Sequence, residues 1–361
     1  AASLPLPQEP ILKKESEFRY MGKTMPRVDI PEKVSGEAIF GFDVDLPDML
    51  YAVLSRPPAY GAKHLSFNAD VAMAIKGVKK VVPTPRGIAV VAENLDAAMK
   101  GRQALETKWD KGTHPDMDTA SVEASFIKDL DKPGASVTIR GDLGKALGEA
   151  SKTHEATYYI PCVAHATMEP QTCTADVKAD QCDVYIPTQG QTLSHMVATK
   201  VSGLPPEKVN IHTTFLGCGL GRRPRPDQLI EAVICSKASG KPVKVVYTRE
   251  EDIQTDYFRS AMGHRIKGGL DVRNKLVAWD HKVSCSSLIT HLGGAPKNGV
   301  DGYCLWGIWD KPGSPVKADM TYKFPNFSVN LVLSDLPIPV APFRSVQNAP
   351  NAFATESFID E

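Results

Sequence analysis

The feature that most constrains this fold is a glycine loop at residues 214–226, TFLGCGLGRRPRP, in which Gly217, Gly219 and Gly221 occupy alternate positions. The apolar segment 209–214 before the loop predicts a strand, and the segment 226–239 after it predicts a helix. Because glycine has no Cβ atom, a ligand or a second segment can approach this backbone closely. Spacing alone leaves two interpretations: a cradle for a phosphate or oxyanion, or a tight strand-to-helix turn with exposed arginines.

The loop differs from the two common nucleotide-binding loops. Its GxGxGRR pattern is not the GxGxxG of dinucleotide-binding folds, and no acidic residue ends a following strand about twenty residues later. It also lacks the Gly-Lys-Ser/Thr ending of a P-loop. The loop therefore does not name its ligand by itself.

Composition excludes several classes of protein. The 361 residues suffice for about two domains. The 42 Lys+Arg balance 42 Asp+Glu, so no net charge directs the chain to nucleic acid. The seven cysteines contain no CxxC pair and no Cys/His cluster, so we expect no metal bound directly by side chains.

The apolar pattern predicts a mixed α/β (α+β) fold in four segments. Residues 1–25 are Pro-rich and charged, as in a linker or arm, and residues 113–152 are a polar connecting segment. Between them, residues 26–112 are expected to form a compact α+β unit with strands at 38–40, 50–54, 78–82 and 87–92 and a helix capped by Asn94. In residues 153–361 we expect strands at 154–160, 173–177, 182–186, 209–214 and 243–248 and helices at 192–202 and 226–239.

Three further groups of polar residues are candidates for function. Gln189 follows a predicted strand in PTQGQT, where its amide is either a ligand contact or ordinary turn polarity. His165 and Glu169, four residues apart, are acid/base or metal-binding groups, or Glu169 is a structural carboxylate that caps backbone amides. Arg344 follows a Pro-rich strand end and is either an anion site or a surface residue.

These motifs occur together, in the same order, in one family. The ordered segments are HATMEPQTCTADV, PTQGQT, FLGCGLGRR, YTREEDIQTDYFRSA, YKFPNF and PFRSVQNAPNAFATESFIDE. The chain resembles the molybdenum-binding large subunit of the xanthine oxidase and aldehyde oxidase family, above all its bacterial isoquinoline 1-oxidoreductase and membrane-associated aldehyde dehydrogenase branch. The resemblance implies an α/β hammerhead domain at 26–112 and the first molybdopterin-binding domain at 153–361, with the second half of the subunit absent from this chain.

The resemblance also implies site residues. Gln189 matches the glutamine that hydrogen-bonds an oxo ligand of molybdenum, and Phe343 and Arg344 match the pair beside the molybdenum and the pterin phosphate. These three residues are the implied catalytic positions. The implied cofactor-binding residues are Gln189, Gly217, Cys218, Gly219, Leu220, Gly221, Phe343, Arg344 and Ser345.

The implied activity is hydroxylation of an aldehyde or an N-heterocycle, with water as the oxygen source. The implied cofactor is molybdenum with molybdopterin, expected in its cytosine dinucleotide form. Implied partners are an iron–sulfur subunit with [2Fe-2S] clusters, a cytochrome c subunit, and a chain that carries the remaining half with its general-base glutamate. A periplasmic or membrane-associated location in a bacterium is implied, with a cytoplasmic location as the alternative.

The chain departs from the family pattern inside the glycine loop. Cys218 and Leu220 replace a glycine and an aromatic residue of the usual GGGFG, and Leu220 is expected to widen the pocket. Arg223-Pro224-Arg225 stands where purine-oxidising members carry a substrate-binding glutamate, so we do not expect a purine substrate. Two alternatives stay open: a half-subunit without turnover of its own, and a nucleotide-binding enzyme outside the family.

Overall fold

The computed structural model describes residues 5, 8–309 and 320–361. Residues 1–39 and residues 40–361 form two separate compact units. The first unit contains the short 3-10 helix η1 (Glu15–Glu17) and helix α1 (Ile30–Ser35). Helix α1 ends at Gly36, whose φ of 83° is left-handed, as is common where a helix stops. All of the sheets and the candidate site belong to the second unit.

A seven-stranded sheet forms one part of the second unit, in the order β10-β9-β8-β11-β1-β4-β3. Its strands are β1 (Leu50–Ser55), β3 (Val78–Thr84), β4 (Gly87–Ala92), β8 (Thr172–Val177), β9 (Cys182–Ile186), β10 (Val209–Thr213) and β11 (Val243–Val246). Strand β1 pairs with β11 in parallel and with β4 in the antiparallel direction. Strands from both predicted domains therefore share one sheet.

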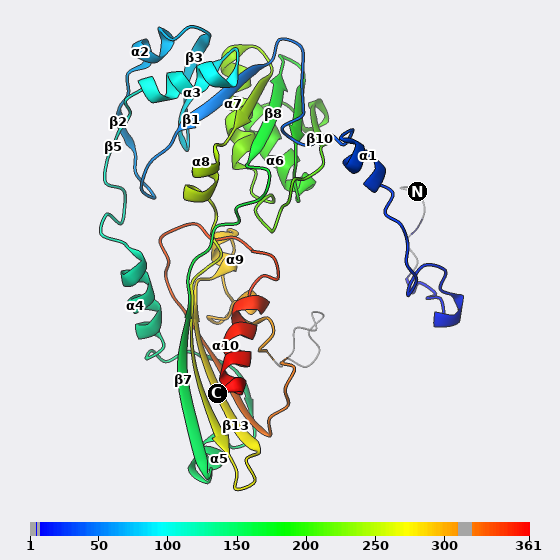
Figure 1. The fold of residues 1–361 in the computed structure, drawn as a ribbon, viewed down its shortest axis with the longest axis vertical. Helices are drawn as coiled ribbons and strands as arrows, with labels where there is room; N and C mark the ends of the chain where they lie inside the picture. Colours follow the sequence, from blue (N-terminus) through cyan, green and yellow to red (C-terminus); the bar gives the residue numbers. More distant parts are fainter. Residues whose placement is uncertain (1–4, 6–7, 310–319) are drawn as a thin grey trace. The chain divides into compact units, whose positions relative to one another are not determined.

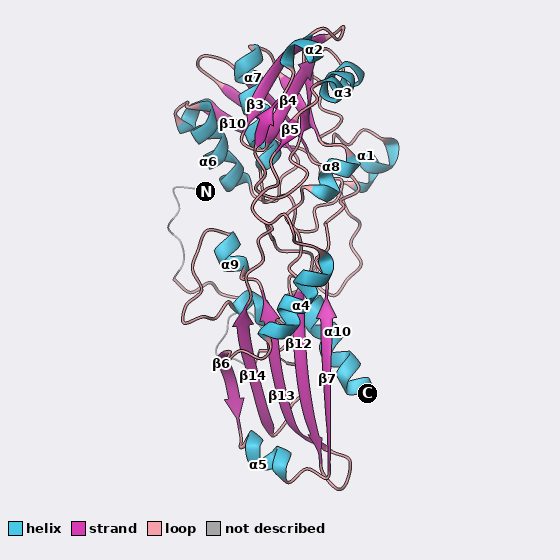
Figure 2. Cartoon of the chain, turned by 90° about the vertical axis from the view of Figure 1, so that its left-hand side faces the viewer, coloured by secondary structure: helices cyan, strands magenta, loops and turns pink. Residues whose placement is uncertain are grey.

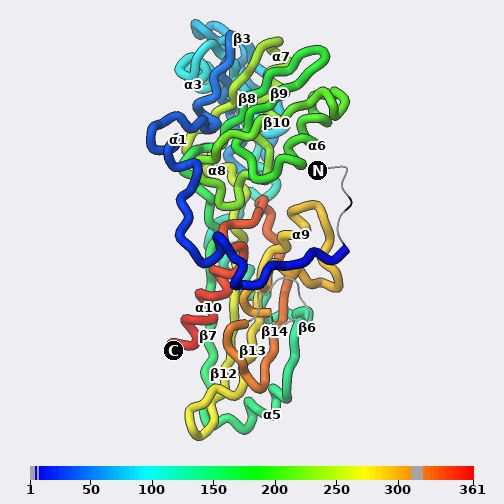
Figure 3. Tube along the Cα trace, turned by 90° about the vertical axis from the view of Figure 1, so that its right-hand side faces the viewer, coloured from blue at the N-terminus to red at the C-terminus, as the bar shows by residue number. Residues whose placement is uncertain are grey.

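Helices cover both faces of this sheet. Alternate residues of a strand point to opposite faces, and two core clusters separate accordingly. Ala52 and Val91 share a cluster with Leu229 of α7 (Asp227–Ser239), beside α6 (Gln191–Ser202). Val53 and Val90 share the other cluster with α3 (Leu95–Ala104) and α2 (Ala69–Met73). Figure 3 shows α6 next to β10.

A five-stranded sheet forms the other part, in the order β6-β14-β13-β12-β7 (Figure 2). Its strands are β6 (Ala135–Arg140), β7 (Lys152–Ile160), β12 (Met262–Leu270), β13 (Leu276–Cys285) and β14 (Asn326–Leu333). Gly263 packs against Phe126 of α4 (Thr119–Asp129), on the face that also contacts α5 (Leu143–Gly148). Gly268 packs against Phe358 of α10 (Asn348–Asp360) on the opposite face (Figure 1).

The remaining elements are short. They are β2 (His64–Ser66), β5 (Lys108–Trp109), η2 (Pro206–Lys208), α8 (Arg249–Gln254), α9 (Leu288–His291) and η3 (Gly302–Leu305). Within the described part of the chain, no helix has the combined length and apolar character that a bilayer span requires.

Most of the elements expected from the sequence are confirmed, with ends that shift by one or two residues. The Asn94 cap is confirmed, because its side chain accepts a hydrogen bond from the Ala97 N–H at 2.9 Å. The strand expected at 38–40 is wrong: Phe40 makes only an isolated bridge with Phe215. The polar segment 113–152 contains α4, β6 and α5, and β6 pairs with β14, a partner nearly two hundred residues away that local pattern cannot reveal.

Ion pairs connect the part of the seven-stranded sheet formed by residues 50–92 with the part formed by residues 172–246. Arg56, which follows β1, donates to both carboxylate oxygens of Glu231 on α7, at 2.8 and 2.9 Å. Its guanidinium also lies 4.0 Å from the centre of the Tyr247 ring. Arg102 on α3 pairs with Glu251 on α8 at 3.1 Å. Such pairs are costly to break from one side, so they fix the orientation of α7 and α8.

A buried histidine pair gives the five-stranded sheet a pH dependence. The Nδ1 atom of His264 lies 3.0 Å from Nε2 of His281, and both residues are fully buried. Burial lowers the pKa of His264 from 6.5 to about 3, and burial together with the neighbouring His264 lowers the pKa of His281. Because the unfolded chain binds these protons more readily, stability is present above about pH 6.5 and falls as the pH drops toward 3.

We predict that His264→Gln makes this decline less steep. Between pH 6 and pH 4, the slope of unfolding free energy against pH should decrease by about 1.4 kcal/mol per pH unit relative to the unsubstituted protein. Urea denaturation at several pH values measures the slope. Equal slopes for the two proteins would contradict a neutral, buried His264.

Candidate functional site

The glycine loop between β10 and α7 has an unusual backbone. Cys218 and Leu220 have left-handed φ angles of 75° and 52°, whereas Gly219 between them lies outside the left-handed region. Successive residues of alternating hand form a nest, in which neighbouring N–H groups point into a common concavity that suits anions. Left-handed conformations cost non-glycine residues about 1–2 kcal/mol. The surrounding contacts must therefore hold the loop in this form.

Three successive amides of the loop are unused within the described chain. The N–H groups of Cys218, Gly219 and Leu220 meet no acceptor among the described residues, and the three residues are half-buried. The flanking amides are satisfied: Gly217 donates to Glu169 Oε2 at 3.0 Å and Gly221 donates to Gln189 Oε1 at 3.2 Å. The loop thus offers a row of donors to a bound group with oxygen acceptors.

Gln189 lies directly against this loop. Its Oε1 atom accepts hydrogen bonds from the Gly221 and Arg223 N–H groups, at 3.2 and 3.3 Å. This network assigns the amide orientation, and the two N–H donors of Nε2 meet no acceptor in the described part of the chain. A Cβ atom on Gly219 would lie 2.7 Å from Gln189 Oε1, so glycine is needed for this close approach.

Glu169 and Arg223 hold the other side of the loop. Glu169 Oε2 accepts from Gly217 N–H and, at 2.8 Å, from Arg223 Nη2, while its Oε1 accepts from Phe42 N–H at 3.2 Å. Arg223 also donates from Nε to the Cys218 carbonyl at 2.7 Å. The interpretation of Glu169 as a structural carboxylate is therefore confirmed.

The alternative of a tight turn with exposed arginines is wrong for Arg222 and Arg223, which are 1% and 0% exposed. Arg222 donates from Nη1 and Nη2 to the two carboxylate oxygens of Asp227, both at 2.9 Å. Its Nε atom lies 2.8 Å from Asp256 Oδ1. Burial alone would raise the pKa of Asp227, but Arg222 and Arg86 outweigh it and hold the pKa below its ordinary value. Burial is possible because each guanidinium finds a carboxylate, and for Arg223 this partner is far away in the sequence.

A third segment, 341–346, completes the cluster. A Cβ atom on Gly221 would lie 1.9 Å from the Pro342 carbonyl oxygen, so this segment touches the glycine loop. The next residue, Phe343, stacks on His165 with ring centres 5.0 Å apart. Arg344 and Ser345 are exposed, and no acceptor in the described chain lies within hydrogen-bond distance of the Arg344 guanidinium.

The structure thus brings together Gln189, the loop Gly217–Gly221 and the segment around Phe343. Their roles stay predictions. Sequence reasoning missed Asp256 and Arg259, although both lie in the segment YTREEDIQTDYFRSA. Asp256 pairs with Arg222, and Arg259 lies near the ring of Phe343. These partners lie in other loops, so local sequence pattern does not predict the contacts.

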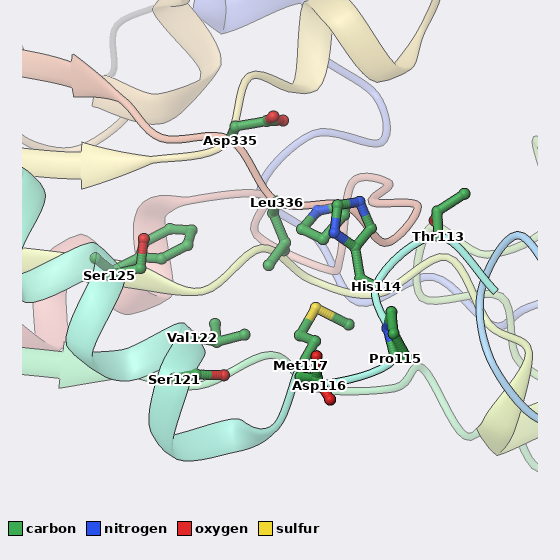
Figure 4. Close-up of a pocket in the computed structure, with 12 residues that line it drawn as sticks. Thr113, His114, Pro115, Asp116, Met117, Ser121, Val122, Ser125, Asp335 and Leu336 are labelled. Carbon is green, nitrogen blue, oxygen red and sulfur yellow. The ribbon is translucent and has the colours of Figure 1, made fainter. Parts of the chain in front are cut away.

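A separate cavity of about 440 Å³ lies between α4 and the segment after β14. Figure 4 shows His114, Met117, Val122 and Leu336 around it. None of the predicted site residues lines it. We therefore do not assign this cavity to the candidate site.

We predict that Gly221→Ala destabilises the protein much more than Gly240→Ala. Both glycines are left-handed, with φ of 100° and 64°, but a Cβ atom at residue 240 meets nothing within 4 Å. The control should cost about 1–2 kcal/mol, and Gly221→Ala should cost at least about 2 kcal/mol more, because its Cβ atom collides with the Pro342 carbonyl. Urea denaturation of both variants measures the difference, and equal losses would contradict the close contact.

We also predict that Arg223→Met lowers the free energy of unfolding by about 3–5 kcal/mol, because it leaves the carboxylate of Glu169 buried without its cation. Arg265→Met is the matched control, since it removes an ion pair of similar length, 2.8 Å to Asp131, at the surface. The control should change stability by less than about 1 kcal/mol. A small effect of Arg223→Met would mean that the buried pair does not hold the loop.

Comparison with known proteins gives this geometry a family. Residues 128–361 match a family described as a molybdopterin cofactor-binding domain. The chain is 29% identical over 363 residues to the isoquinoline 1-oxidoreductase subunit beta of Brevundimonas diminuta, covering 97% of this chain and 45% of that protein. It is also 29% identical over 368 residues to the membrane-bound aldehyde dehydrogenase (pyrroloquinoline-quinone) of Gluconacetobacter polyoxogenes, covering 97% and 47%.

Solved structures share the fold. The aldehyde oxidoreductase of Desulfovibrio gigas superposes with a TM-score of 0.72 at 17% identity, covering 93% of this chain and 41% of that one. The chain spans about half the length of the relatives it matches. The family match covers more than half of the chain. The chain therefore belongs to the molybdopterin cofactor-binding family, among the molybdenum-binding subunits of the xanthine oxidase type.

Proposed function

We propose that the chain is part of a molybdenum hydroxylase that oxidises an aldehyde or an N-heterocycle, takes oxygen from water and passes electrons to an iron–sulfur subunit. The observation that carries this proposal is the row of free amides at Cys218, Gly219 and Leu220 beside the Gln189 amide. The names of the relatives, an isoquinoline oxidoreductase and an aldehyde dehydrogenase, support the two substrate classes.

The donor set fits a phosphorylated pterin that carries a metal with oxygen ligands. Such a group has many hydrogen-bond acceptors. This site provides neutral hydrogen-bond donors, namely the three loop amides and the Gln189 Nε2 group. The charges of Arg222 and Arg223 are neutralised inside the protein, whereas Arg344 is exposed and can reach a phosphate. When bound, the molybdenum–pterin group supplies two-electron redox chemistry.

Each site residue then has a defined task. Gln189 donates from Nε2 to an oxygen atom of the cofactor, and its two backbone hydrogen bonds fix its direction. The loop amides at 218–220 bind anionic oxygens. Arg344 and Ser345 contact the phosphate, while Phe343 presents an aromatic face beside the reacting group.

The finer parts of the proposal rest on the relatives. We propose the cytosine dinucleotide form of the cofactor, and [2Fe-2S] clusters on a partner subunit, because the seven cysteines of this chain have no cluster spacing. We also propose a cytochrome c subunit and a periplasmic or membrane-associated location, in line with the name of the membrane-bound relative. The general-base glutamate and part of the substrate pocket would come from the remaining half of the subunit.

A half-subunit that binds the cofactor or a partner without turnover is the second candidate. The two candidates differ in one observation. Turnover requires a general base in the active assembly, and we propose that this base is the glutamate of a Gly-Glu segment. Family membership excludes the third alternative, a nucleotide-binding enzyme outside this family.

We predict that Gln189→Ala and Arg344→Ala lower molybdenum and pterin content, or turnover, by at least about tenfold, because each removes a hydrogen-bond donor of the proposed site. Glu93→Ala, which removes an exposed ion pair with Lys79, is the control and should leave both unchanged. Metal analysis, pterin fluorescence and oxidation of aldehydes and N-heterocycles with an artificial electron acceptor measure the effects in the assembled enzyme. Equal losses in all three variants would mean that the site lies elsewhere.

A further inference from the structure

Phe343 contacts two side chains from distant segments. The imidazole ring of His165 stacks on one side, with ring centres 5.0 Å apart and an interplanar angle of 29°. The guanidinium carbon of Arg259 lies 5.7 Å from the centre of the Phe343 ring. A stacked ring and a nearby cation restrict where an aromatic side chain can move. Phe343 therefore has a defined position although it is only half-buried.

His165 is itself fixed on three sides. Its backbone N–H and its Nδ1 atom lie 2.5 and 2.9 Å from Asp256 Oδ2, and its Nε2 atom lies 3.1 Å from the Pro342 carbonyl oxygen. The side chains of His165 and Asp256 are each 1% exposed. One imidazole ring thus contacts both the Phe343 ring and the carbonyl group immediately before it.

The Pro342 carbonyl connects this contact to the glycine loop. The same oxygen atom that faces His165 is the atom against which Gly221 packs, without room for a Cβ atom. Gly221 in turn donates to Gln189. A displacement of His165 would therefore change the position of Phe343 relative to the Gln189 amide.

Asp256 connects His165 to helix α7 through Arg222. The Oδ1 atom of Asp256 accepts a hydrogen bond from the Tyr257 N–H at 2.7 Å and lies 2.8 Å from Arg222 Nε. Arg222 also donates to both carboxylate oxygens of Asp227, in the first turn of α7. The two adjacent arginines of the loop thus have different partners. Arg223 fixes the loop through Glu169, and Arg222 fixes the support of His165 through Asp256.

The backbone after Phe343 is strained and needs contacts that fix its conformation. Ser345 and Val346 have left-handed φ angles of 71° and 53°, and this conformation is especially unfavourable for a β-branched residue such as valine. Strained backbone persists only where its surroundings fix it. The contacts of His165 with Pro342 and Phe343 lie immediately before this strained pair.

We infer that His165 is a positioning residue that, through Asp256 and Arg222, fixes the Phe343–Arg344 segment against the glycine loop and the Gln189 amide. The purpose of this positioning, alignment of Phe343 and Arg344 with a bound cofactor, rests on the proposed function. His165 itself contacts neither the amide of Gln189 nor the free loop amides.

Hydrogen–deuterium exchange of the full purified protein tests this inference. In His165→Phe, which keeps an aromatic ring but loses the contacts of both ring nitrogens, the amides of Ala341 and Val346 should exchange at least about tenfold faster. The amides of β4 and β12 should keep their protection. A purely structural role would instead speed exchange throughout the protein, and either that result or unchanged exchange at 341–346 would overturn the inference.

His154→Phe is the matched control, because His154 also binds a carboxylate, Glu361 at 2.7 Å, and contacts the ring of Phe358, but at the exposed end of α10. It should leave exchange at 341–346 unchanged. If His165→Phe does not fold, Asp256→Asn keeps the shape of the support and weakens its charge-assisted contacts, and it should give the same local increase. Unchanged local exchange in Asp256→Asn would also overturn the inference.

This measurement needs no bound molybdenum. Unchanged exchange would therefore overturn the positioning role and leave the proposed function intact. Absence of molybdenum and pterin from the unsubstituted protein would overturn the proposed function and leave the exchange result standing.

Discussion

The site depends on two adjacent buried arginines whose charges are neutralised inside the protein. Arg222 pairs with Asp227 and Asp256, and Arg223 pairs with Glu169. A buried guanidinium without a carboxylate would cost several kcal/mol. These pairs therefore fix the glycine loop relative to the segments that carry Glu169 and Asp256. Their fixed position allows the glycine loop that precedes them to expose backbone amides to a ligand instead of satisfying them internally.

This arrangement separates structural charge from ligand recognition. The loop arginines Arg222 and Arg223 hold the site together through their buried ion pairs. In the proposed function, recognition falls to neutral donors, the loop amides and the Gln189 amide, and to the exposed Arg344. Neutral donors with fixed directions suit a large cofactor with many oxygen and nitrogen atoms, because they select geometry rather than net charge.

Local pattern in the sequence predicted most of the elements and the glycine positions of the site. Apolar runs located strands such as β4, and Asn94 marked a helix start through capping chemistry that is local by nature. The order of motifs indicated that Gln189, the glycine loop and Phe343 belong to one site. Local pattern did not reveal the burial of Arg222 and Arg223, the contact of His165 with Phe343, or the pairing of β1 with β11, because each depends on a partner that only the folded chain brings near.

The central claim is that the glycine loop and Gln189 bind a molybdenum-containing pterin. The most direct measurement is the molybdenum and pterin content of the protein purified anaerobically with all the chains that accompany it. The account predicts about one molybdenum and one pterin per copy of this chain. A folded protein that contains neither would contradict it.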